Sequence, residues 1–252
     1  MVTYDVFLSF RGIDTRKNFT GNLYNCLQHQ RGIKTFIDDE KIKKGKQITH
    51  TLLQAIKESR IYIAILSPNY ASSTFCLTEL AAILDCSKLR GRMFLPVFYD
   101  VDPSHVRNIT GTYAEAFAKH EVRFRGEKEK LQKWRNALQQ AASVCGWHFI
   151  PGPGSGPGYE YKLIGEIVEY VFEKINHEKI DELKDGAKEF FDDLEESVKE
   201  IIDDLEEDVK EIVDDLEEGY DDLKEDVKEF YDDLEEGVKG IFLNIVSFFD
   251  SN

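Results

Sequence analysis

The stretch YDVFLSFRG, residues 4–12, contains the pattern from which the fold is predicted. Its mostly apolar run closes with Arg11-Gly12, and residues 15–30 then place the apolar side chains of Phe19, Leu23 and Leu27 four positions apart. A short apolar run, a glycine and a helical period predict a strand, a turn and a helix. The chain is therefore expected to begin with a βα unit.

The same alternation of apolar runs and helical segments returns along the next 140 residues. Further strands are predicted at 33–37, 61–66, 93–99 and 147–150, the last as an edge strand. Helices are predicted at 48–58, at 75–89 and across 103–144 with a break near Gly126. Apolar strands separated by helices indicate a parallel sheet that is covered on both faces. The predicted fold class is α/β, a doubly wound sheet of the flavodoxin-like sort.

Residues 151–158, PGPGSGPG, predict an exposed loop, because prolines and glycines at this density do not hold regular structure. Helical spacing resumes over residues 159–175 and predicts the last helix of the domain. The first domain is therefore expected to span residues 1–176.

An eleven-residue repeat begins at Asp181: DELKDGAKEFF, DDLEESVKEII, DDLEEDVKEIV, a shortened DDLEEGY, DDLKEDVKEFY and DDLEEGVKGIF. Three apolar positions per unit give a period of about 3.67, which is typical of a nearly straight helix with one apolar stripe. The shortened unit is two near-complete turns and keeps the stripe in phase. The sequence thus predicts one amphipathic helix in residues 177–252, and its repeats would span about 93 Å.

An apolar stripe on such a helix must be covered by something. We favour self-association as a coiled coil. Contact with the chain's own first domain, a helix lying on a lipid surface, and a solvated, partly disordered segment are the alternatives. Lipid-surface helices usually carry Lys and Arg on the polar face, which this segment lacks. The glycines at 186, 219, 237 and 240 favour the solvated alternative.

The formal net charge of −16 is unevenly divided along the chain. Residues 1–180 hold 25 Lys and Arg against 19 Asp and Glu, a net +6, whereas residues 181–252 hold 7 against 29, a net −22. Such an acidic segment repels phosphates, so no nucleic-acid partner is expected.

Cysteine and histidine placement argues against disulfides and metal sites. The four cysteines form no CxxC pair and are expected to be reduced thiols, and the six histidines are scattered without ligand spacing. No secretory leader or apolar stretch of about 18 residues is present, so neither secretion nor membrane insertion is expected. We expect a cytoplasmic or nuclear protein.

The first 176 residues resemble the Toll/interleukin-1 receptor (TIR) domains of plant immune proteins. The resemblance rests on six segments in order, YDVFLSFRGIDTRKNFTGNLY (4–24), GIKTFIDDEKIKKGKQI (32–48), ILSPNYASSTFCLTEL (65–80), LPVFYDVDPSHVRNITGTYAEAF (95–117), KWRNALQQAA (133–142) and IGEIVEYVFEKIN (164–176). It covers about 70% of the chain. No GxxxxGK[ST] motif or leucine-rich repeat occurs in these 252 residues, and we expect a TIR-only chain with an acidic helical tail.

The resemblance implies a five-stranded parallel sheet, association with other TIR domains or TIR-type immune receptors, and cleavage of NAD⁺ into nicotinamide and ADP-ribose or cyclic products. It implies Glu79 as the catalytic residue and NAD⁺ as substrate, with no cofactor. It further implies a substrate site lined by Phe10, Arg11, Gly12, Ser73, Phe75 and Lys43. For Arg11, an ion pair with Asp14 or Asp38 is an equal alternative.

One carboxylate is chemically sufficient for this reaction. Nicotinamide leaves the ribose as a neutral base from a cationic pyridinium, so no general acid is needed. The enzyme has to stabilise an oxocarbenium-like ribosyl centre and orient the ribose hydroxyls, which one positioned carboxylate can do. Ordinary glycoside hydrolysis differs, because there two carboxylates are the rule.

The sequence departs from the family pattern at two places. Position 75 is Phe where the family usually has Trp, and Gly21-Asn22 stand where many plant members have a Ser-His pair in a helix-to-helix interface. The tail repeats are a candidate replacement for that interface. The alternative to an enzyme is a non-catalytic TIR adaptor or decoy that acts by binding other TIR domains.

Overall fold

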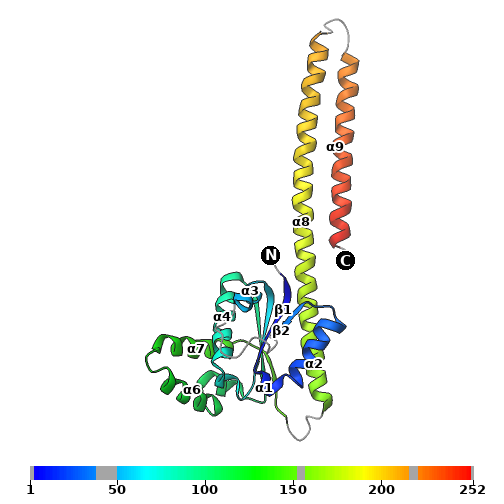
Figure 1. Cartoon of the computed structure of the whole chain (residues 1–252). Helices are drawn as coiled ribbons and strands as arrows, with labels where there is room; N and C mark the ends of the chain where they lie inside the picture. Colours follow the sequence, from blue (N-terminus) through cyan, green and yellow to red (C-terminus); the bar gives the residue numbers. More distant parts are fainter. Residues whose placement is uncertain (1–2, 38–49, 152–156, 216–220, 251–252) are drawn as a thin grey trace. The chain divides into compact units, whose positions relative to one another are not determined.

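Five parallel strands form one sheet in the order β2-β1-β3-β4-β5. Figure 1 labels two of them, β1 and β2. The structure is a computed structural model that describes residues 3–37, 50–151, 157–215 and 221–250. The strands are β1 (Tyr4–Phe10), β2 (Thr35–Ile37), β3 (Ser59–Leu66), β4 (Met93–Tyr99) and β5 (Trp147–Phe149). The order and the parallel direction confirm the predicted flavodoxin-like α/β fold.

The described helical elements fall in chain order between and after these strands. They are α1 (Gly12–Thr15), α2 (Phe19–Asn25), η1 (Cys26–Gln30), α3 (His50–Lys57), η2 (Tyr70–Ser72), α4 (Thr74–Arg90), α5 (Pro103–Asn108), α6 (Thr112–Arg123), α7 (Lys128–Ala141), α8 (Pro157–Asp215) and α9 (Asp221–Asp250). None of the described helices carries an apolar stretch long enough to cross a bilayer. By contacts the chain divides into two compact units, Met1–Ile175 and Asn176–Asn252.

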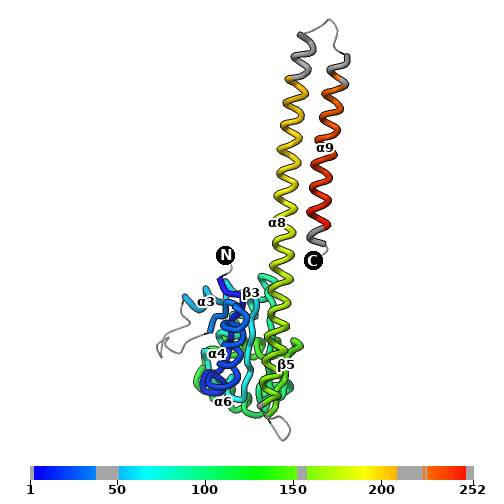
Figure 2. Tube along the Cα trace, turned by 90° about the vertical axis from the view of Figure 1, so that its right-hand side faces the viewer, coloured from blue at the N-terminus to red at the C-terminus, as the bar shows by residue number. Residues whose placement is uncertain are grey.

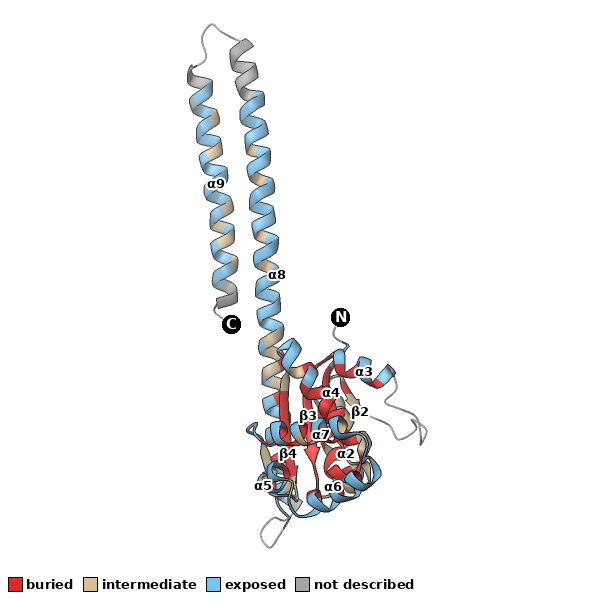
Figure 3. Cartoon of the chain, turned by 90° about the vertical axis from the view of Figure 1, so that its left-hand side faces the viewer, coloured by how far each residue is buried: buried red, intermediate tan, exposed pale blue. Residues whose placement is uncertain are grey.

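The sheet is buried on both faces, and each face has its own apolar core (Figure 3). Alternate residues of one strand reach opposite faces, so Phe7 packs in one core while Val6 and Leu8 pack in the other. The first core is completed by α3, α4, α6 and α7. The second is completed by α2, η1 and the beginning of α8, whose Ile164, Ile167, Val168 and Val171 are buried.

The first predicted helix is wrong as a single element. The chain forms the short helix α1, then α2, and then the π-helical η1 within residues 12–30. Phe19, Leu23 and Leu27, the residues with the helical spacing, are nevertheless all buried in the second core. Spacing of four therefore predicted the buried face but not the breaks in the backbone.

The predicted loop at 151–158 is shorter than expected. Residues 152–156 lie outside the described residues, and Pro157 and Gly158 already belong to α8. Proline is well suited to a helix start, because its missing N–H would have no partner there.

A long helix follows the sheet, as predicted, and α8 continues through the first repeats to Asp215. The later repeats form α9, so the second unit is a helical hairpin and not one helix through all the repeats. Figures 1 and 2 show α9 beside the second part of α8. The ring centroids of Phe191 and Phe242 lie 5.5 Å apart. The hydrogen bond with Glu235 on the same helix raises the pKa of Lys239, and the charge of Glu195 on α8 acts in the same direction. Burial and the charges of Glu206 and Asp208 raise the pKa of Tyr231. Because the residue numbers of these contacts increase along α8 while they decrease along α9, the two helices are antiparallel.

Candidate functional site

Glu79 lies on α4, five residues after the first residue of that helix. Ser73 is the N-cap, and its side chain accepts a hydrogen bond from the Cys76 amide at 3.2 Å. This cap fixes the start of the helix, so Glu79 stands about one and a half turns in. Its side chain is only 3% exposed. A carboxyl group is rarely buried to this extent without a structural or functional reason.

A chain of polar contacts connects the start of α4 with the end of β1. The Ser9 hydroxyl lies 2.7 Å from the Tyr70 hydroxyl, which donates to the Cys76 carbonyl at 3.2 Å. The Cys76 thiol donates to the Phe10 carbonyl at 3.6 Å. Because β1 and β3 are neighbours at the centre of the sheet, these contacts lie at the carboxyl edge where the strand order reverses, the usual place for ligand sites in open α/β sheets.

The ionisation of two buried groups reports the position of the Glu79 charge. Burial and, to a smaller extent, the negative charge of Glu79 raise the pKa of the Cys76 thiol to about 12, while the hydrogen bond with Ser73 and the charge of Arg11 oppose this increase. Burial also raises the pKa of Tyr70, with Cys76 and Glu79 acting in the same direction. Arg11, Cys76 and Glu79 are therefore within electrostatic reach of one another. A thiol with this pKa stays protonated at neutral pH, so Cys76 is not suited to be a nucleophile.

The Asp14 carboxylate makes its contacts away from Arg11. It accepts hydrogen bonds from the Ser67 hydroxyl at 2.5 Å and from the Asn69 amide at 3.2 Å. Among the described residues the buried Nε of Arg11 has no hydrogen-bond partner. Of the two ion pairs considered for Arg11, that with Asp14 is absent from this part of the chain, and Asp38 lies outside the described residues.

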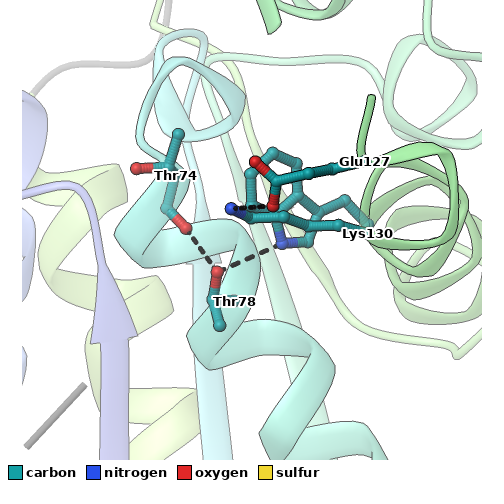
Figure 4. Close-up of polar contacts among 5 residues, drawn as sticks. Thr74, Thr78, Glu127 and Lys130 are labelled. Carbon is teal, nitrogen blue, oxygen red and sulfur yellow. Dashed lines mark hydrogen bonds and ion pairs between the residues drawn. The ribbon is translucent and has the colours of Figure 1, made fainter. Parts of the chain in front are cut away.

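The turn of α4 that carries Glu79 is anchored to α7 (Figure 4). The Thr78 hydroxyl donates to the Thr74 carbonyl at 2.7 Å and accepts from Nε1 of Trp134 at 3.1 Å. Trp134 is 1% exposed, and the ammonium of Lys130 lies 5.3 Å from its ring centroid. Lys130 is in turn paired with Glu127 at 2.9 Å. These contacts limit the rotation of α4 next to the carboxylate.

The predicted site residues have different surroundings. Phe10 and Ser73 are buried, whereas Arg11, Gly12 and Phe75 are partly exposed. Lys43 lies outside the described residues, as does the rest of the lysine-rich segment. Sequence reasoning missed Ser9, Tyr70 and Cys76. The one available signal was Ser9, a polar residue inside an otherwise apolar strand.

A separate groove runs between α4 and α7. It is lined by residues such as Ala81, Asp85, Lys133 and Gln140, and it includes none of the predicted site residues. Among the described residues no three His, Cys, Asp or Glu side chains are arranged to hold a metal ion. The four cysteines are free thiols.

Comparison with known families identifies the family to which the fold belongs. The profile of the family described as "TIR domain" matches residues 3–190. The chain belongs to the TIR family. Disease resistance protein RPV1 of Vitis rotundifolia is 46% identical to this TIR chain over 179 residues, which are 71% of this chain and 12% of that protein. TMV resistance protein N of Nicotiana glutinosa is 49% identical over 144 residues, 57% of this chain and 12% of that protein.

Among solved structures, the chain is also similar to a TIR domain of the plant resistance type. The TIR domains in the structure of the activated Roq1 resistosome directly recognizing the pathogen effector XopQ match with 44% identity and a TM-score of 0.59. This match covers 67% of this chain and 99% of that chain. The TIR chain described here spans about an eighth of the length of the two disease-resistance relatives.

Proposed function

We propose that this TIR chain is an NAD⁺ hydrolase and ADP-ribosyl cyclase of plant immune signalling, with Glu79 as its catalytic residue. The observation that carries the proposal is the buried Glu79 carboxylate at the carboxyl edge of β1 and β3, held by an anchored helix, with the charges of Glu79 and Arg11 both acting on Cys76. A fixed negative charge at this edge would stabilise the ribosyl cation that forms as nicotinamide leaves. The oxygen of water or of a ribose hydroxyl then bonds to the ribosyl carbon and loses its proton.

Arg11 is suited to bind the diphosphate of NAD⁺. A guanidinium offers planar, forked donors that match phosphate oxygens, and the Nε of Arg11 has no protein partner within the described part of the chain. Phe75 offers an aromatic face for stacking without the N–H that tryptophan would add. Ser73 supports the site indirectly, because its oxygen already accepts the hydrogen bond that caps α4.

Activation by association of TIR domains is part of the proposal. With Glu79 only 3% exposed, substrate reaches its carboxylate only after the surrounding side chains part. Contact with other TIR domains is a natural trigger for that opening. The disease-resistance relatives and the resistosome match support a role in an assembled immune complex.

The test is nicotinamide release from NAD⁺ by the full chain at high protein concentration. We expect Glu79→Gln to lose at least about 100-fold in rate, a barrier increase of roughly 2.7 kcal/mol. Asp85→Asn is the matched control, because Asp85 is an exposed carboxylate on the same helix, paired with Lys133. Equal rates for the Glu79→Gln variant and the parent would refute the catalytic role. Absence of release from every form would favour the adaptor or decoy.

A further inference from the structure

The repeat positions in the helical hairpin divide into two sets with different burial. The full eleven-residue units begin at 181, 192, 203, 221 and 232. Every described residue at positions 7 and 11 of these units is partly buried between the two helices; these residues are Ala187, Phe191, Val198, Ile202, Val227, Tyr231, Val238 and Phe242. The two helices of the hairpin thus use the same repeat positions to contact each other.

Positions 3 and 10 are equally apolar, and the residues there whose side chains the structure describes remain exposed. On α8 they are Leu183, Phe190, Leu194, Ile201 and Leu205, and on α9 they are Phe230, Leu234 and Ile241. Their exposed fractions run from 39% to 65%. Solvated single apolar residues are ordinary, but a continuous row on each of two adjacent helices is not.

Both rows lie on the same side of the hairpin. Two antiparallel helices that contact each other through identical positions are related by a two-fold axis perpendicular to the plane of the pair. A row displaced to one side of the contact on α8 is therefore displaced to the same side on α9. The hairpin has one broad apolar face, and the acidic positions 1, 5 and 9 project from the other side.

The apolar face has the area of a stable protein interface. Taking roughly 180 Å² for a fully exposed Leu, Ile or Phe, the eight side chains leave about 750 Å² in solvent per hairpin. Two such faces in contact would bury about 1,500 Å², close to the standard size for a specific complex.

Small residues border this apolar face. Gly186, Ser197 and Gly237 occupy position 6, next to the exposed rows. A Cβ added at either glycine would meet no atom within 4 Å. Glycine in a helix costs about 1 kcal/mol relative to alanine, so these glycines weaken the helices without improving the packing of the hairpin. They would let another helix approach closely.

We propose that the apolar face of the hairpin binds the same face of a second copy, forming a four-helix bundle. The chain already packs these repeats against each other despite their shared negative charge, since α8 and α9 carry the same units. In the dimer the carboxylates at positions 1, 5 and 9 stay in solvent, where salt screens their repulsion within about 8 Å at physiological ionic strength. Position 6 is Asp208 near the C-terminal end of α8 and Asp226 near the N-terminal end of α9, and both are larger than glycine or serine. The closest packing of the two copies is therefore expected at the opposite end of the hairpin.

The test is sedimentation equilibrium of the full chain between about 0.05 and 0.5 M NaCl. We expect a dimer that strengthens as salt increases, because screening removes repulsion and leaves the apolar contact. The triple variant Leu194→Gln, Ile201→Gln and Ile241→Gln should dimerise about 100-fold more weakly. The matched control, Glu196→Gln, Glu207→Gln and Glu236→Gln, alters exposed residues at position 5 on the polar side and should dimerise at least as tightly as the parent.

Circular dichroism at 222 nm verifies that both triple variants keep their helices. Dimerisation that is unchanged in the Leu194, Ile201 and Ile241 variant would overturn the proposal. So would association that weakens with salt, which would indicate contact between the acidic hairpin and a basic surface. Binding of phosphatidylcholine vesicles by a chain that stays monomeric would also overturn it and would identify a lipid surface as the occupant.

Discussion

Replacing Gly21 with serine should destabilise the first unit, although related domains often carry serine at this position. A Cβ on Gly21 would lie 2.6 Å from the carbonyl oxygen of Arg16, a main-chain atom between α1 and α2. Relief of this contact requires the backbone to shift by about half an ångström. Overpacking of this kind costs about 1–3 kcal/mol, and the better helix propensity of serine returns roughly 0.5 kcal/mol.

The net loss of roughly 0.5–2.5 kcal/mol corresponds to a decrease of roughly 1–10 °C in the melting temperature of a domain of this size. Tryptophan fluorescence is the suitable assay, because both tryptophans, Trp134 and Trp147, lie in the first unit. Gly126→Ser is the control, since a Cβ there would meet no atom within 4 Å. A Gly21→Ser variant that melts within about 1 °C of the parent would refute the reasoning.

Three further predictions concern the sheet edge, a buried thiol and the anchor of α4. Gly146→Ala should destabilise the first unit by about 3 kcal/mol, because the added Cβ would lie 2.0 Å from the Pro96 carbonyl oxygen. The melting temperature followed by tryptophan fluorescence should therefore decrease more than in Gly21→Ser. An unchanged melting temperature would contradict this. Iodoacetamide at pH 8 should modify the exposed Cys145 but leave Cys76 intact in the folded protein, because burial raises the pKa of Cys76 to about 12. Equal labelling of the two cysteines in mass spectrometry would count against this account. Thr78→Val leaves the Trp134 N–H unpaired, so it should cost about 1–3 kcal/mol of stability and lower kcat for nicotinamide release with little change in KM. Thr78→Ser keeps the hydroxyl and should preserve the stability and kcat of the parent. Equal kcat in the two variants would argue against positioning by Thr78.

The sheet was predictable because its strands are buried on both faces. Residues 4–10 and 93–99 were predicted with the bounds that the structure has, and the third strand is extended only by Ser59 and Arg60. Central parallel strands are continuous apolar runs that resemble nothing else in the chain. The helical segment after β1 was predicted as one piece because apolar spacing marks a buried face and carries no information on where a backbone breaks.

The tail shows the same limit more clearly. Its period predicted helices correctly, but the hairpin depends on which surface covers the stripe, and a period does not specify a partner. The division of the apolar residues into positions 7 and 11 inside and positions 3 and 10 outside also has no signal in the sequence, because both sets are equally apolar. In the candidate site, Glu79 followed from the resemblance, whereas Tyr70 and Cys76 became visible only through their contacts.

The two edge strands of the sheet are its shortest. β2 and β5 have three residues each, whereas the three central strands have seven, eight and seven. A long open edge would offer unpaired backbone groups to the edge of another molecule and invite sheet-to-sheet aggregation. With short edges, copies of this domain can be crowded together without joining their sheets. Such a domain is suited to signalling that starts when copies of the domain associate and stops when they dissociate.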